Sequence, residues 1–417
     1  MKARGALRVW GRACLALVCC ATGVWGGEAT RIQLGRALDG KGGTLHDVTI
    51  VVQGGRIVAI EPTAPRPAKA APSYDLRNLT VLPGLIDVHD HLVWHFNAQG
   101  RLHTEKDGES KGAAALAAAA NAFSTLAAGF TTVQSPGSPE DAELREAIER
   151  RGLPGPRILT SLEPLDEGSG GPEELRRAVQ ARKAEGADLI KLFASKSIRE
   201  GGGATMTEEQ LGAACGEAKA LGLRTLVHAH SSESIRRAVK AGCTEIEHGV
   251  FADDETLALM AERGVYFDPQ CGLIFQNYLD NKAKYLGIEN YTEEGFQAME
   301  RAVPLAVATF RRAIATKGLK VVFGTDAVAG AHGRNIEELL CRVKEGGQPV
   351  MDAVVSATSV AAESLGLGGR IGSLTQGSEA DLVAVDGDPL KDPEALRRVA
   401  FVMRGGKVVR NVLAAGN

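Results

Sequence analysis

Two histidines separated by one residue, at the end of an apolar run, are the first residues of this chain whose types and spacing suggest chemistry. They are His89 and His91, in the stretch VLPGLIDVHDHL that spans residues 81–92. Alternate side chains of a β-strand lie on one face, so both imidazoles point the same way. Neutral imidazole is a common metal ligand. The pair predicts half of a metal site, and two core histidines held by hydrogen bonds are the plainer alternative.

Similar residues close other apolar runs further along the chain. His228 and His230 end the run RTLVHAH, His248 ends EIEH, and Asp326 follows VVFGT. Any one of them could be an ordinary core residue. As a set, imidazoles and a carboxylate at the ends of successive apolar runs predict one polar site that a metal ion would occupy.

Lys191 lies inside the apolar run LIKLFAS. Strand alternation puts its side chain on the same face as Phe193 and Ser195, which is the inner face if the histidines also point inward. An unpaired ammonium there would be costly, and metal ions would repel it. A salt bridge is the structural alternative. The sharper hypothesis is a neutral amine that carries CO2 as a carbamate, an anionic ligand with two oxygens.

The segments that position these residues alternate between strand and helix patterns. Eight β-rich runs are predicted as strands: residues 81–87, 130–133, 157–160, 189–194, 224–228, 245–250, 265–267 and 320–324. Helical patterns follow them, and Thr207 with Gln210 forms a capping box at the start of one helix. Eight strand–helix units over this length predict a (β/α)8 TIM barrel, in which active sites lie at the carboxyl ends of the strands.

Short β-rich runs also lie near both ends of the chain. They are residues 48–52, 56–60, 380–385, 399–403 and 407–409. The glycine pairs Gly54-Gly55 and Gly405-Gly406 separate two pairs of these runs, a pattern typical of β-hairpins. We therefore expect a small β-sandwich domain formed from both chain ends. The predicted divisions are residues 27–80 and 368–417 for this sandwich and residues 81–367 for the barrel.

Residues 1–26 have the pattern of a signal peptide. Basic residues come first, at positions 2, 4, 8 and 12, and a short apolar segment and small residues follow. The apolar segment is shorter than the ~20 residues that span a bilayer. The pattern predicts export to a periplasm or to the outside of the cell, with no stable membrane span after cleavage.

Composition narrows the classes of partner. The formal net charge is -3, and no basic block is present, so nucleic acid is not an expected partner. Three of the seven cysteines lie in residues 1–26, and the other four match no zinc or redox spacing. We expect Cys215, Cys243, Cys271 and Cys341 to be buried free thiols. A disulfide would need an oxidising compartment, and the sequence selects no pairing. Assembly into a homo-oligomer is left open.

Several of these motifs, in this order, resemble the amidohydrolase superfamily of metal-dependent hydrolases. They are PGLIDVHDH, IKLFAS, HAH, IEHG and GTDA, and the closing segment GSLTQGSEADLVAVDGDP extends the resemblance over nearly the whole chain after residue 26. Within the superfamily, HAH, EHGVF and GTDAVAGAHG resemble the imidazolonepropionase-like branch. That branch includes prolidase-like dipeptidases that use a carboxylated lysine.

The resemblance implies a two-metal site. The implied ligands are His89 and His91 for one divalent ion, His228 and His248 for the second, and Lys191 as a carbamate that bridges them. Asp326 would contact the first ion and a bridging hydroxide and act as general base. Zinc suits the nitrogen and oxygen ligands best, with manganese and cobalt as alternatives.

The implied reaction is hydrolysis of the amide C–N bond of a small substrate, such as a dipeptide or an N-acyl amino acid. His230 competes with His228 for one ligand position and is assigned to substrate binding. His332, Tyr266 and residues 275–285 are further candidates for substrate contacts. A one-metal cyclic-amide hydrolase or deaminase is the alternative, although Ser231 stands where such deaminases have Glu. A non-catalytic metal-binding relative is the alternative of another class.

Overall fold

The structure is a computed structural model, and it describes residues 28–63 and 73–413. The predicted signal peptide, residues 1–26, lies outside these residues. Within them, no helix combines the length and the apolar character needed to cross a membrane.

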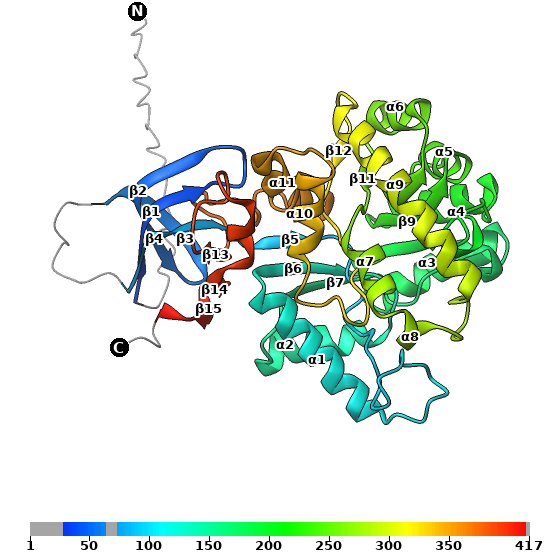
Figure 1. The fold of residues 1–417 in the computed structure, drawn as a ribbon, viewed down its shortest axis with the longest axis horizontal. Helices are drawn as coiled ribbons and strands as arrows, with labels where there is room; N and C mark the ends of the chain where they lie inside the picture. Colours follow the sequence, from blue (N-terminus) through cyan, green and yellow to red (C-terminus); the bar gives the residue numbers. More distant parts are fainter. Residues whose placement is uncertain (1–27, 64–72, 414–417) are drawn as a thin grey trace, which may run out of the picture.

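Eight short strands form the centre of the larger part of the molecule (Figure 1). They are β5 (Leu85–Asp87), β6 (Phe130–Ser135), β7 (Arg157–Thr160), β8 (Leu189–Phe193), β9 (Arg224–Ser231), β10 (Glu245–Phe251), β11 (Tyr266–Asp268) and β12 (Lys320–Val321). All neighbouring pairs are parallel, and they form one sheet in the order β5-β6-β7 and another in the order β8-β9-β10-β11-β12. All eight predicted strands are therefore present.

Backbone hydrogen bonds link the two sheets at both seams. Val88 N–H donates to the Phe323 carbonyl at 3.0 Å beside β5 and β12, and Asp188 N–H donates to the Thr160 carbonyl at 2.8 Å beside β7 and β8. These bonds do not join the sheets into one continuous ladder. The α/β architecture is as predicted, whereas closure of the barrel is not shown.

Helices surround these strands, and most of them lie where the sequence predicts helices. They are α1 (Lys111–Ala127), α2 (Glu140–Arg151), α3 (Pro172–Ala184), α4 (Glu208–Ala220), α5 (Ser232–Lys240), α6 (Asp254–Arg263), α7 (Leu273–Asp280), α8 (Lys282–Tyr285), α9 (Glu293–Ala315), α10 (Ile336–Lys344), α11 (Val350–Ser356) and α12 (Ser359–Ser364). The capping box at α4 is confirmed, because Thr207 and Gln210 each bond the other's backbone N–H. The alanine-rich α1 and the short α7 and α8 were not predicted.

Segments from both ends of the chain form one seven-stranded sheet, which Figure 1 shows as adjacent blue and red strands. Its strands are β1 (Thr30–Leu38), β2 (Thr44–Gln53), β3 (Arg56–Pro62), β4 (Tyr74–Pro83), β13 (Leu382–Val385), β14 (Val399–Arg404) and β15 (Lys407–Asn411). The order is β15-β14-β13-β4-β1-β2-β3. The pairing of the two ends is confirmed. Two facing layers, as a β-sandwich has, are not confirmed in the described residues.

The predicted strand 81–87 is divided between the seven-stranded sheet and the eight parallel strands. Its first residues belong to β4, and β5 begins at Leu85 after a break at Gly84. A Cβ atom at Gly84 would lie 2.0 Å from the Thr131 hydroxyl oxygen, so only glycine lets the chain pass here. An apolar cluster that includes Leu82, Leu85 and Phe130 packs the seven-stranded sheet against the parallel strands across this break.

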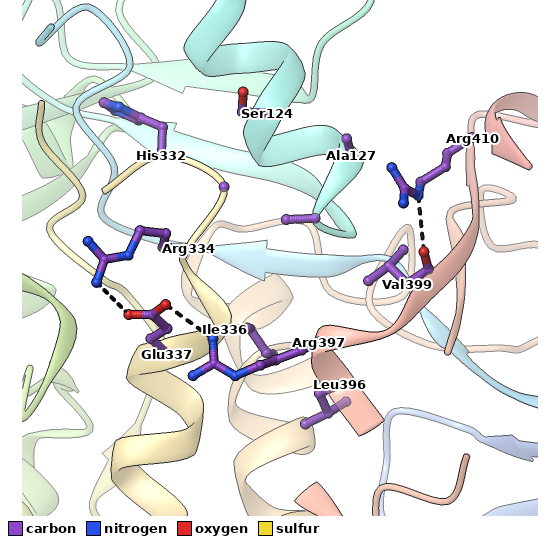
Figure 2. A pocket seen from close by; sticks show the side chains of 12 residues that line it. Ser124, Ala127, His332, Arg334, Ile336, Glu337, Leu396, Arg397, Val399 and Arg410 are labelled. Carbon is purple, nitrogen blue, oxygen red and sulfur yellow. Dashed lines mark hydrogen bonds and ion pairs between the residues drawn. The ribbon is translucent and has the colours of Figure 1, made fainter. Parts of the chain in front are cut away.

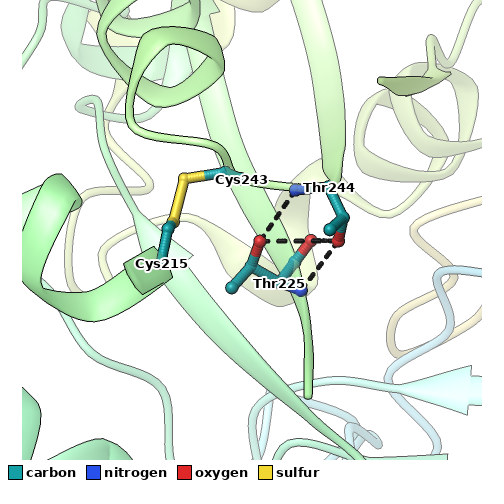
Figure 3. Close-up of a disulfide and its surroundings, with 4 residues drawn as sticks. All are labelled: Cys215, Thr225, Cys243 and Thr244. Atoms are coloured by element: carbon teal, nitrogen blue, oxygen red, sulfur yellow. Dashed lines mark hydrogen bonds between the residues drawn. A yellow bond between two sulfur atoms is a disulfide. The ribbon is translucent and has the colours of Figure 1, made fainter. Parts of the chain in front are cut away.

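A disulfide joins Cys215, on α4, to Cys243, which lies just before β10 (Figure 3). The prediction of free thiols was therefore wrong for these two residues. Their Cα atoms are 5.2 Å apart although 28 positions separate them in sequence, a proximity that no local pattern reveals. Beside the disulfide, Thr225 and Thr244 each accept the other's backbone N–H at 2.8 Å. Cys271 and Cys341 are free thiols, as predicted.

Cys215→Ser should lower the free energy of unfolding by about 3 kcal/mol, because it opens a covalent loop across 28 residues. Thermal unfolding with and without a reductant measures the effect. The reductant should lower the Tm of the wild type and leave that of Cys215→Ser unchanged. Cys271→Ser is the matched control and should keep the sensitivity to reductant; equal Tm values for reduced and oxidised wild type would contradict the assignment.

Candidate metal centre

Three ligand-type atoms from β5 and from the segment after β12 converge on one point. His89 Nε2 lies 3.2 Å from His91 Nε2, and Asp326 Oδ1 lies 3.3 Å from the first and 3.1 Å from the second. Zinc ligands lie about 2.0–2.2 Å from the ion, so two ligands of a tetrahedral ion are about 3.4 Å apart. The spacing of these three atoms fits one metal ion.

His89 and Lys191 share a buried carboxylate from β10, Glu247. Glu247 Oε1 lies 2.9 Å from His89 Nδ1, and the other carboxylate oxygen forms an ion pair with the Lys191 ammonium. All three side chains are almost fully inaccessible to solvent. A carboxylate at Nδ1 orients the ring so that Nε2 faces the ligand position. Glu247 was not predicted as a site residue, because its neighbours in the sequence do not distinguish it from the other Glu residues. Only the tertiary contacts do so.

Three more imidazoles form a second group, from β9 and β10. The ring centroids of His228, His230 and His248 lie 4.6–4.9 Å apart. The His248 ring lies 5.4 Å from the His89 ring, so the two groups adjoin. Gln270 Oε1 lies 2.8 Å from His248 Nδ1 and fixes this ring. The rings of His228 and His230 lie at similar distances from the His248 ring, 4.6 and 4.9 Å. These distances do not show which of the two is the metal ligand.

The backbone at two of these residues adopts the left-handed conformation, which non-glycine residues rarely do. The φ angle is 68° at His248 and 54° at Asp326. Such a conformation costs about 1–3 kcal/mol and is found where a side chain must be aimed at a site. Strand alternation alone would put His248 on the face opposite Glu247. The positive φ instead brings both side chains to the same centre.

Close packing explains why the first residue of the GTDA motif, Gly324, is glycine. A Cβ atom at Gly324 would lie 2.2 Å from Asp268 Oδ2 and 2.9 Å from His89 Cβ. Gly324 therefore lets the segment that carries Asp326 approach β5. Asp326 N–H donates to the His89 carbonyl at 2.7 Å, which fixes that approach.

Burial and neighbouring charges leave most of the imidazoles neutral. Burial lowers the pKa of His228 and His248 well below the ordinary value, and it also lowers the pKa of His91. Burial also disfavours the charged form of His89, but the Glu247 carboxylate outweighs this effect and raises the pKa of His89. Burial alone would raise the pKa of Asp326; the His89 and His91 rings outweigh it and hold the pKa below the usual range. Neutral rings and an ionised carboxylate are the forms that bind metals.

A fully buried ion-pair network lies beneath the centre. The Arg342 guanidinium contacts Asp268 at 3.1 Å and Glu338 at 3.2 Å. Arg342 also donates to the Val322 and Gly324 carbonyls at 2.6 and 3.2 Å. These bonds satisfy carbonyls that lie just after β12, which ends at Val321, three residues before the end of the predicted strand 320–324.

A cationic and aromatic wall lies beside the second group. The Arg199 guanidinium carbon is 4.0 Å from the centroid of the Tyr291 ring, and Arg199 Nε donates to Asn290 at 2.9 Å. The Tyr291 hydroxyl donates to the Tyr278 hydroxyl at 3.0 Å. Burial, with a smaller contribution from the charge of Arg199, lowers the pKa of His230 to about 3. The predicted stretch 275–285 contains Tyr278, whereas Arg199 gave no sequence signal.

Two predicted substrate contacts lie away from these groups. Tyr266 is at the start of β11, where its hydroxyl accepts from Lys320 Nζ at 3.2 Å, so it is at the amino end of the strands. His332 Nε2 lies 3.1 Å from the His91 carbonyl and 3.3 Å from Asp90 Oδ1. His332 thus holds the backbone of the HxH segment.

His332 also lines a separate pocket of about 440 Å³ between the C-terminal end of α1 and the seven-stranded sheet. Figure 2 shows Arg334 and Arg397 both directed at Glu337, at 2.8 and 3.1 Å. These contacts neutralise part of the cationic charge in the pocket. Its lining includes none of the converging imidazoles and not Asp326, so it is not the space next to the candidate centre.

The donor set fits divalent metal ions. Two sets of three side chains at this centre each bring their donor atoms within 4.8 Å of one another. One set is His89, His248 and Asp326, and the other is His228, His230 and His248. Nδ1 of His230 is buried and has no hydrogen-bond partner. Imidazole nitrogen with carboxylate oxygen is a donor set that suits zinc.

Comparison with known proteins gives consistent matches. A family model described as the amidohydrolase family matches residues 80–409. The solved structure of a Xaa-Pro dipeptidase with bound methionine is 32% identical, with a TM-score of 0.82, and the match covers 92% of this chain and 100% of that chain. An imidazolonepropionase of Xanthomonas oryzae pv. oryzae is 25% identical over 411 residues, covering 90% of this chain and 96% of the relative. An ochratoxinase of Aspergillus niger is 29% identical over 248 residues, which are 58% of this chain and only 50% of the relative.

Glu247→Gln should lower the zinc affinity of the protein by about 10–100-fold, because a neutral amide orients the His89 ring less firmly than the carboxylate does. Competition with a chromophoric chelator measures the affinity. Glu245→Gln is the matched control, since Glu245 is also buried on β10. An unchanged affinity in the Glu247 variant would show that this carboxylate does not support the centre.

Proposed function

The chain belongs to the amidohydrolase family, and we propose that it hydrolyses the amide C–N bond of small substrates such as dipeptides or N-acyl amino acids. The observation that carries this proposal is the position of Asp326. Its carboxylate lies within 3.3 Å of two imidazole nitrogens and has a pKa held below the usual range. An ionised carboxylate at the edge of a metal site can accept a proton from water.

The proposed centre holds two divalent ions, with zinc as the preferred metal. The proposed ligands are His89, His91 and Asp326 for one ion, His228 and His248 for the other, and Lys191 between them. Bound zinc would supply a Lewis acid that lowers the pKa of water and polarises a carbonyl. His230 is assigned to substrate binding beside the second group.

In the proposed mechanism Asp326 moves the proton. Its carboxylate takes a proton from the attacking water and delivers it to the amine that leaves when the C–N bond breaks. The hydrogen bond from Asp326 N–H to the His89 carbonyl holds the carboxylate in place for both transfers. Glu247 keeps the His89 ring oriented throughout, and His332 fixes the backbone at His91.

The proposed state of Lys191 in the active protein is a carbamate. Its amine nitrogen bonds to the carbon of CO2 and loses one proton. One observation supports this state. The Lys191 ammonium contributes to lowering the pKa of His91 and of His228, so it is close to both groups. An ammonium there would oppose binding of two cations. The carbamate reverses that charge.

Arg199 is the proposed anchor for the free carboxylate of a dipeptide. Its guanidinium is partly buried among aromatic rings, close enough to His230 to lower the pKa of that ring. Guanidinium recognises carboxylates through paired hydrogen bonds. The similarity to a Xaa-Pro dipeptidase supports a substrate that ends in such a carboxylate.

Barrel closure and export are also part of the proposal. The hydrogen bonds at both seams of the eight strands support a closed (β/α)8 arrangement. The Cys215–Cys243 disulfide supports export, because disulfides persist in oxidising compartments.

A one-metal hydrolase is the second candidate, and one observation favours it. The Lys191 ammonium is already paired with Glu247, as a purely structural lysine would be. The metal content of Lys191→Ala and its response to short carboxylic acids separate the two candidates.

The test of the proposed reaction is a hydrolysis screen with the zinc-loaded protein against dipeptides, their C-terminal amides and N-acyl amino acids. We expect turnover of at least one free dipeptide and slower turnover of its amide. Asp326→Asn should keep the fold and at least one metal and lower kcat by about 10²–10⁴-fold, as loss of a general base does. A metal-loaded Asn variant with normal kcat would remove Asp326 from the mechanism.

Lys191→Ala should lose the bridge between the two ions, so its zinc content should fall and its activity with it. Acetate or propionate should restore some activity, because a short carboxylate can occupy the space that the carbamate leaves. Metal analysis and kinetics with added acids measure both effects.

A merely structural lysine predicts a different outcome for the same variant. Lys191→Ala would then unfold at a lower temperature, keep the metal content of the wild type, and gain nothing from short acids. That result would overturn the carbamate and favour the one-metal candidate.

A further inference from the structure

A second cluster of metal-ligand side chains lies in the loop between β5 and α1, outside the centre described above. His95, His103 and Glu109 each offer one ligand atom, and these atoms lie within 4.8 Å of one another. His95 Nε2 is 2.6 Å from Glu109 Oε2, and the two imidazole rings stack with centroids 4.6 Å apart. His95 is buried and the other two are partly buried.

The hydrogen bonds of His95 leave its Nε2 atom in need of a cation. His95 Nδ1 lies 2.8 Å from the Val93 carbonyl, which can only accept, so the ring proton is at Nδ1. With this proton at Nδ1, Nε2 faces the Glu109 carboxylate across 2.6 Å. This contact needs a positive charge at Nε2, which a proton or a bound metal ion supplies.

His103 has the arrangement of a metal ligand held by a carboxylate. Its Nδ1 lies 2.9 Å from Asp107 Oδ2. Asp107 is itself fixed, because its oxygens accept from Asn97 Nδ2 at 2.8 Å and from the backbone N–H of Thr104 and Glu109 at 3.1 and 2.9 Å. His103 Nδ1 also lies 3.3 Å from Glu109 Oε2, the oxygen that faces His95 Nε2. The ring of His103 is therefore held with Nδ1 facing the same carboxylate oxygen as His95.

The cluster also carries negative charge that no basic side chain balances. Among the described residues, the ion-pair partners of Glu109 are His95 and His103, and that of Asp107 is His103; no Lys or Arg pairs with either carboxylate. The Asp107 and Glu109 carboxylates place their negative charge in a partly buried loop. A divalent cation offsets that charge.

We propose that His95, His103 and Glu109 bind a structural zinc ion that fixes the loop between β5 and α1. Two imidazoles and one carboxylate form a zinc donor set, with a water completing four ligands. The loop carries Trp94, whose ring centroid is 5.5 Å from that of His91, and Phe96, which packs on Tyr285. The ion would therefore order the wall of the candidate centre without taking part in its chemistry.

The test is the zinc content of the purified full chain, in paired variants. Glu109→Gln and His103→Gln should each bind about one zinc fewer than the wild type. Glu105→Gln is the matched control, because Glu105 is an exposed residue of the same loop. The same loss should occur when Glu109→Gln is added to Lys191→Ala, which separates this site from the proposed hydrolytic centre. Equal zinc contents in Glu109→Gln and the wild type would overturn the proposal.

A measurement on the wild type keeps the proposal testable if the variants fail to fold. Diethylpyrocarbonate modifies accessible imidazoles, and His103 is 25% exposed. Added zinc should protect His103 from modification, and peptide mass spectrometry should detect no protection of the exposed His46. Equal modification of His103 with and without zinc would show that the cluster is only a hydrogen-bonded loop closure.

Discussion

The buried contact of Glu247 with Lys191 and His89 is the interaction on which the rest of the candidate centre depends. It joins β10, β8 and β5, and so links the two parallel sheets at the level where the imidazoles converge. Removing one member of such a buried pair typically costs about 3–5 kcal/mol, because a charge is left without a partner. The position of the first imidazole pair is therefore tied to the position of the lysine.

Backbone strain is present at the same place. His248 and Asp326 both have positive φ, and glycine at position 324 lets the last segment approach His89. A buried arginine network beneath them takes over the carbonyls that strand pairing leaves free. Strained residues supported by many fixed neighbours are typical of sites where side chains must be held in advance of binding.

Amino-acid patterns predicted much of the fold and the ligand-type residues. All eight parallel strands lie where short apolar runs predict strands, and the singled-out histidines, lysine and aspartate lie in or just after five of them, β5, β8, β9, β10 and β12. Both chain ends pair in one sheet, as predicted. These features could be predicted because strand periodicity and chain reversal at glycine pairs are local properties. For the same reason His89 and His91 were expected on one face, and their Nε2 atoms are 3.2 Å apart.

Tertiary structure decided the features that depend on contacts between distant segments. Glu247 and Arg199 were not predicted as site residues, because their neighbours along the chain do not distinguish them from charged surface residues. The Cys215–Cys243 disulfide was missed for the same reason, since only packing of α4 near the start of β10 brings the two sulfurs together. Tyr266 and His332 lie away from the converging imidazoles, because a residue's place along a strand or loop decides which end of the sheet it faces. The sequence by itself thus determined which residues can bind and react, and the tertiary structure determined which of them meet.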